Sequence, residues 1–99
     1  MRRAARTDTN QAELVEVMRQ MGASVQDLSM VGSGCPDLVV GFRGRNYMVE
    51  IKTEKGKLRT AQHRWHGEWR GHVSVIRTVD DAVALLGGHL MHEQLGMVP

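Results

Sequence analysis

The sequence predicts an α/β domain in which helices flank a mixed four-stranded sheet, in the order helix, strand, strand, strand, helix, strand, helix. Three observations lead to this prediction. Apolar residues recur at helical spacing near the N-terminus, a short turn separates two apolar β-type runs, and a helical segment precedes a fourth apolar run. A hairpin followed by a helical crossover gives a sheet with both antiparallel and parallel neighbours. We expect one domain over residues 1–99, with its core at about 8–87.

The first helix is expected from Asn10 to Gly22. Its apolar residues follow helical spacing: Leu14, Val17, Met18 and Met21. Thr9 or Asn10 can cap its start, and Glu13 lies three residues after Asn10, as in a capping box. Gly22 can end the helix in the left-handed conformation.

A short strand within 23–30 and a loop at 31–36, which holds two glycines and a proline, follow the first helix. The next two strands are expected as a hairpin, with strands at 37–42 and 47–52 and a turn at 43–46. If Phe42 pairs with Tyr47 across this turn, Asp37 lies opposite Lys52, and Glu50 takes the neighbouring diagonal position.

The second half of the chain holds the crossover helix and the last strand and helix. We expect a polar loop at 53–57, a helix at 61–70 capped by Thr60, a strand at 72–76, a helix at 79–86 and a loose tail at 88–99. Gly87 and Gly88 are expected to end the last helix, whose first turn holds two aspartates.

Composition and charge exclude several classes of protein. The chain lacks an apolar run long enough for a membrane span, its N-terminus does not resemble a secretory signal, and a single cysteine excludes an internal disulfide framework. We therefore expect a cytoplasmic protein without a membrane partner or an organic cofactor. The net charge is only +2, but nine basic and three acidic residues fall between 41 and 77, which favours a polyanionic partner.

Three charged residues are expected to meet at one end of the sheet. Side chains alternate along a strand, so Glu50 and Lys52 share a face, and the hairpin brings Asp37 beside them. Two neighbouring carboxylates repel each other, and Mg²⁺ or Mn²⁺ would relieve the repulsion and activate a bound water. The alternative is a salt bridge between Asp37 and Lys52, with Glu50 solvated.

These residues carry a resemblance to a known family. The segments Pro36-Asp37 and Glu50-Ile51-Lys52 resemble the signature of restriction-endonuclease-like nucleases. The continuation from Gly56 to Gln62, followed by Trp65, is similar to the VRR-NUC branch of that superfamily, which includes small stand-alone bacteriophage proteins. The resemblance covers residues 8–87 approximately.

The resemblance implies a restriction-endonuclease-like core and Mg²⁺- or Mn²⁺-dependent hydrolysis of phosphodiester bonds in DNA. Asp37, Glu50 and the backbone carbonyl of Ile51 would hold the metal, and Lys52 would be the catalytic lysine. A glutamate of the first helix often joins such sites, and Glu13 matches best, Glu16 less well. Gln62 would hold a water or a phosphate, or cap its helix locally.

The same resemblance implies a homodimer, possible selectivity for branched or Holliday-junction DNA, and a bacterial host cytoplasm. Lys55, Lys57 and Arg59 follow Lys52 closely and are expected to contact phosphates. The sequence leaves open whether DNA or RNA is the substrate. It also leaves two other functions open: a non-catalytic DNA-binding module of the same fold, and a small interaction protein that docks through Trp65 and Trp69.

Three other features have ordinary interpretations. The pairs His63–His66 and His89–His92 have the spacing of zinc ligands on a helix, but exposed histidines are favoured because a third ligand is missing. Trp65 and Trp69 share a stripe with Ala61, which favours core packing or a dimer face over base stacking. Cys35 lacks the motif of a thiol nucleophile.

Overall fold

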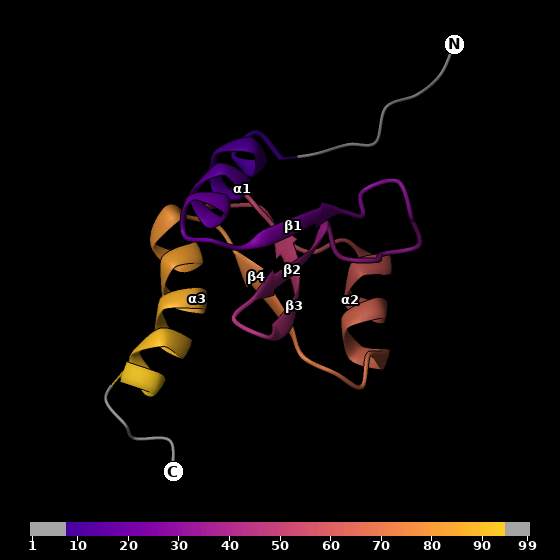
Figure 1. Ribbon diagram of the computed structural model, residues 1–99. Coiled ribbons are helices and arrows are strands. Elements are labelled where there is room, and N and C mark those ends of the chain that lie inside the picture. The colour runs from indigo at the N-terminus through magenta and orange to yellow at the C-terminus, as the bar shows by residue number, and fades with distance from the viewer. Residues whose placement is uncertain (1–7, 95–99) are drawn as a thin grey trace.

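The computed structural model describes residues 8–94, and the side chains of residues 8–87. The predicted order of elements and the α/β class are confirmed (Figure 1). The elements are α1 (Gln11–Gln20), β1 (Ser24–Asp27), β2 (Leu38–Phe42), β3 (Arg45–Ile51), α2 (Thr60–Glu68), β4 (Val73–Ile76) and α3 (Val79–Gln94). Within the described residues, none of the helices is long and apolar enough to cross a lipid bilayer.

The four strands lie in the order β1-β2-β3-β4. Strand β2 is antiparallel to both β1 and β3. Strand β4 runs parallel to β3, because α2 carries the chain back to the end of the sheet at which β3 begins. Figure 1 shows α2 on one side of the sheet and α3 on the other. The predicted mixed sheet is confirmed.

The hairpin register differs from the predicted one. Arg43 and Gly44 alone form the turn, with φ of 51° and 82°, and Phe42 pairs with Arg45. Two consecutive left-handed residues are typical of the tight type I′ turn, so Arg45 and Asn46 continue as strand. The prediction of a turn at 43–46 was wrong, and Asp37 lies across from Glu50 rather than from Lys52.

The hydrophobic core lies on one face of the sheet. Leu38 and Val40 of β2 and Val49 and Ile51 of β3 are fully buried there. Helices α1 and α3 cover this face with Leu14, Met18, Ala82 and Leu86. Because neighbours along a strand point to opposite faces, Glu50 and Lys52 point to the other side, toward α2.

The residues at the starts of α1 and α2 make contacts that differ from the predicted caps. Asn10 makes no side-chain cap; its amide donates instead to the carbonyls of Lys52 (3.1 Å) and Arg77 (2.8 Å). These contacts fix the start of α1 to the ends of β3 and β4. Helix α2 begins one residue earlier than expected, with Arg59 rather than Thr60 at its N-cap. Gly22 has a φ of 103°, as predicted for the end of α1.

Helix α3 is longer than predicted. It continues through Gly87 and Gly88 to Gln94, so the expectation of a helix end at 87 and a tail from 88 was wrong. A glycine costs a helix only about 1 kcal/mol relative to alanine. The good helix formers that follow in 89–94, such as Leu90 and Met91, allow the helix to continue. Residues 1–7 and 95–99 lie outside the described part of the chain.

Candidate active site

Asp37, Glu50 and Lys52 meet at one end of the sheet. Glu50 is 1% exposed and Lys52 is 7% exposed. Asp37 directly precedes β2, and its Oδ2 accepts a hydrogen bond of 2.7 Å from the backbone N–H of Ile51. The observed register continues from the Leu38–Val49 pair to Asp37 and Glu50, so their side chains lie on the same face.

Helix α2 covers Glu50 with polar side chains. Gln62, 5% exposed, donates from Nε2 to Oε2 of Glu50 at 2.9 Å and accepts from the backbone N–H of Arg59 at 2.8 Å. The Nζ atom of Lys52 lies 3.9 Å from Oε2 of Glu50. The Nε2 atom of His66 lies 3.9 Å from the other oxygen, Oε1. Gln62 therefore both caps α2 and orients the carboxyl group.

The environment of Glu50 disfavours its charged form. Burial, the negative charge of Asp37 and a hydrogen bond between the two carboxyl groups raise the pKa of Glu50 to about 8, although the charge of Lys52 acts in the opposite direction. Asp37 and Glu50 are thus close enough to compete for one proton. At neutral pH the pair carries less than two full negative charges unless a cation joins it.

The donor atoms at this point fit a hard divalent cation. Oε1 of Glu50 is buried and lacks a hydrogen-bond partner among the described residues. In an extended strand the N–H and C=O of one residue point to the same side. Because the N–H of Ile51 donates to Asp37, the carbonyl of Ile51 also points toward Asp37. Two carboxylates, a carbonyl and waters are typical ligands of Mg²⁺ or Mn²⁺. Among the side chains that the structure describes, those of residues 8–87, there is no cluster of three or more His, Cys, Asp and Glu able to bind a metal.

The glutamates expected from the first helix are not among the groups that shift the pKa of Glu50. Glu13 and Glu16 are exposed on α1, and Glu16 accepts from the amide of Gln20. The acidic residue before α1 whose charge helps raise the pKa of Glu50 is Asp8. The prediction of Glu13 as a ligand is not supported by its position. Nothing in the sequence indicated this, because only the folded chain holds Asn10, two residues after Asp8, against the backbone of Lys52.

A cavity of about 190 Å³ opens beside the carboxylates. The loop before β2 and the start of α2 line it, with Asp37, Cys35, Arg59 and Gln62 among the lining residues. Burial and the charges of Glu50 and Asp37 raise the pKa of the Cys35 thiol, which disfavours a thiolate nucleophile. Arg59 lines the same cavity as Asp37.

The basic residues expected to contact phosphates lie in the segment between β3 and α2. Lys55, Lys57 and Arg59 are all exposed there. Arg77 holds the first part of this segment, because its Nη1 donates to the carbonyls of Thr53 (2.8 Å) and Gly56 (2.5 Å). Counting charges along the sequence gave no sign of this role for Arg77.

The remaining aromatic and histidine predictions have mixed outcomes. Trp65 is half-buried, Trp69 is 45% exposed, and their rings stack with centroids 4.5 Å apart. Ala61 is exposed, so the prediction of a core-packing stripe was wrong; Gln62 and His66 face the sheet instead. His63 is exposed, as expected. The side chains of the second histidine pair lie outside the described residues.

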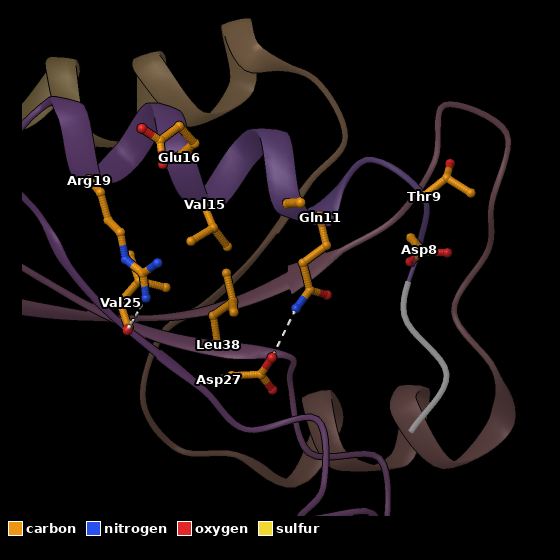
Figure 2. A pocket seen from close by; sticks show the side chains of 10 residues that line it. Asp8, Thr9, Gln11, Val15, Glu16, Arg19, Val25, Asp27 and Leu38 are labelled. Atoms are coloured by element: carbon orange, nitrogen blue, oxygen red, sulfur yellow. Dashed lines mark hydrogen bonds between the residues drawn. The ribbon is translucent and has the colours of Figure 1, made fainter. Parts of the chain in front are cut away.

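A larger cavity, of about 720 Å³, lies between α1 and β1 (Figure 2). Gln11 points into it and donates to Oδ2 of Asp27 over a long 3.4 Å, and Arg19 donates to the carbonyl of Val25 at 3.2 Å. Glu50, Lys52 and Gln62 do not line this cavity. The cluster of polar side chains at the strand ends, and not this larger cavity, is therefore the candidate active site.

Comparisons with known proteins agree with this geometry. A family model described as the VRR-NUC domain matches residues 2–80. A solved structure titled "VRR_NUC domain" is 31% identical, superposes with a TM-score of 0.65, and is matched over 78% of this chain and 89% of its own. No curated protein sequence matches the chain.

Proposed function

The chain belongs to the VRR-NUC family, a family of nuclease domains that act on DNA, and from this premise we propose that it is an endonuclease that hydrolyses DNA phosphodiester bonds with Mg²⁺ or Mn²⁺. One observation carries the proposal. Asp37 and Glu50 lie within hydrogen-bonding reach of each other next to the buried Lys52, while Oε1 of Glu50 is unpartnered. A divalent cation would neutralise the two carboxylates and give Oε1 of Glu50 a partner.

Asp37, Glu50 and the carbonyl of Ile51 are the groups that would hold the ion. When bound, the ion supplies a Lewis acid that stabilises charge on the scissile phosphate and favours deprotonation of the attacking water. Lys52 lies beside Glu50, where its ammonium group orients that water or neutralises the growing negative charge. Gln62 keeps the Glu50 carboxylate in place through Oε2.

Lys55, Lys57 and Arg59 are proposed to position the DNA backbone. They follow β3 directly, and Arg59 also lines the cavity next to Asp37. Phosphate contacts of this kind position a substrate without reading its bases. We further propose that the protein acts as a homodimer on branched DNA in the cytoplasm, since two copies of so small a nuclease domain would present two sites to two strands.

The test is cleavage of plasmid and four-way-junction DNA by the parent and by Glu50→Gln, each with Mg²⁺ and with Mn²⁺. Loss of a transition-state charge contact typically costs about 10²–10³-fold in rate, so we expect at least this loss in Glu50→Gln. Glu54→Gln is the matched control, because Glu54 is exposed four residues away. Equal cleavage by Glu50→Gln and the parent would disprove the assignment.

A non-catalytic DNA-binding module is the alternative, favoured only by the exposed basic segment at 55–59. Calorimetric titration with Mn²⁺ separates the two functions. Metal binding by the parent that is lost in Asp37→Asn supports the nuclease. Salt-sensitive DNA binding without any heat from Mn²⁺ supports the module.

A further inference from the structure

Two buried polar atoms face each other at the site without a hydrogen bond. They are Nε2 of His66 and Oε1 of Glu50, which lie 3.9 Å apart. Neither has a hydrogen-bond partner among the described residues. Unpaired buried polar atoms are rare in folded proteins, and they concentrate where function requires them. The proposed mechanism so far gives His66 no role.

The Glu50 carboxylate is held on one side only. Gln62 donates to Oε2, and Lys52 lies 3.9 Å from the same atom, whereas Oε1 accepts from neither. A carboxylate oxygen has two lone pairs, so Oε1 can contact a cation with one and accept a hydrogen bond with the other. His66 is the side chain that faces this second lone pair.

Helix α2 places His66 for this contact. Gln62 and His66 are four residues apart, so they lie on the same face of the helix, one turn from each other. The ring of Trp65 contacts the imidazole edge-on, with centroids 6.1 Å apart and an interplanar angle of 73°, which restricts rotation of the histidine. The two α2 side chains therefore approach the two oxygens of one carboxyl group separately.

We propose that His66 is a positioning residue: when the metal binds, the present gap of 3.9 Å closes and Nε2–H of His66 donates a hydrogen bond to Oε1 of Glu50, which fixes the carboxylate on the side opposite to Gln62. The proposal rests on the proposed function, since it concerns the same metal site. Hydrogen bonds to ligating carboxylates generally matter for affinity: removing such a partner typically weakens metal binding about 10–100-fold.

Calorimetric titration of the full chain with Mn²⁺ alone is the first test. We expect His66→Ala to bind Mn²⁺ about 10–100-fold more weakly than the parent. His66→Gln should recover most of the affinity, because its amide nitrogen can donate from a similar distance. His63→Ala is the matched control on the same helix, since His63 is exposed, and it should bind as the parent does.

Nitrogen-15 NMR of the metal-free protein is the second test, and it remains informative even if His66→Ala fails to fold. We expect the His66 ring to carry its proton on Nε2 and its Nε2 resonance to shift when Mg²⁺ is added. A proton on Nδ1 alone, or parent-like Mn²⁺ affinity in a folded His66→Ala, would overturn the positioning role while leaving the nuclease intact. Absence of any Mn²⁺ binding by the parent would instead remove the proposed function and the inference with it.

Discussion

At the scale of single residues, Glu50 shows how the site works against the stability of the fold. It occupies a fully buried strand position between two core residues, Val49 and Ile51, where an apolar side chain would fold more readily. Burial of its carboxyl group, together with the neighbouring charge of Asp37, raises its pKa to about 8. A local conflict of this kind is expected at a functional site and not in a structural core.

This raised pKa predicts how stability changes with pH when divalent ions are chelated. Between its ordinary pKa near 4.5 and about 8, Glu50 binds more protons in the folded than in the unfolded state. The free energy of unfolding should therefore fall as pH rises through this window, by up to about 1.4 kcal/mol per pH unit from this group. Urea denaturation of the parent and of Glu50→Gln at several pH values measures the effect.

The difference between the two proteins reports on the carboxyl pair of Asp37 and Glu50, because the titrating groups outside this pair are common to both. We expect the parent to lose stability relative to Glu50→Gln as pH rises from 5 to 8. Addition of Mg²⁺ at pH 8 should stabilise the parent and leave the variant nearly unchanged. A constant difference across this pH range would contradict the account of the carboxyl pair.

The residue scale also shows what the sequence could predict of the site. Strand alternation and the hairpin were enough to identify Asp37, Glu50 and Lys52. The error in the predicted register left these side chains on the same face of the sheet. The observed register differs from the predicted one by two residues along the strand, and an even shift leaves every side chain on the same face. His66 and Asp8 were missed because their approach to Glu50 depends on packing between distant elements.

At the scale of elements, the connections decide the details of the fold. The periodic segments α1 and β2 could be predicted because their apolar patterns are strong. The length of the hairpin turn and the end of α3 could not, since Gly44 lies in a turn whereas Gly87 lies within a helix. The same residue type has opposite meanings in these two places, and only tertiary packing distinguishes them.

The loop before β2 provides a prediction at this scale. Gly34, with a φ of 81°, packs so closely on α2 that a Cβ atom would collide with the carbonyl oxygen of Ala61. Gly32 has nearly the same φ, 80°, but open space around it. Gly34→Ala should therefore destabilise the protein more than Gly32→Ala, which pays only the left-handed strain of about 1–2 kcal/mol.

Thermal or urea unfolding of the two glycine variants measures this difference, with Gly32→Ala as the matched control. A shift of α2 to relieve the collision would also move Gln62, which follows Ala61 directly. We therefore expect Gly34→Ala to bind Mn²⁺ more weakly than Gly32→Ala does. Equal stability and equal metal affinity of the two variants would contradict the close packing of the loop on α2.

At the scale of the whole molecule, the distribution of charge matters more than the small net charge of +2. The carboxylates are recessed at the strand ends, and the exposed cations Lys55, Lys57 and Arg59 lie in the segment that leaves that same end. Arg77 holds this segment against the sheet, because its side chain donates to backbone carbonyls of the segment. If this segment contacts phosphates as proposed, the arrangement would bring a polyanion to an acidic site that would otherwise repel it.

The last prediction follows from this separation of roles between the basic segment and the acidic site. Neutralising phosphates releases counterions, so each contact contributes about 0.9 to the slope of log affinity against log salt on duplex DNA. The double variant Lys55→Ala, Lys57→Ala should bind DNA more weakly and lower this slope by about 1.8 if both lysines contact phosphates. Arg45→Ala is the control, since Arg45 is exposed at the far end of β3, beside the hairpin turn. Fluorescence anisotropy at several salt concentrations, with Ca²⁺ in place of Mg²⁺, measures both quantities; an unchanged slope in the double variant would place the DNA on another face of the molecule.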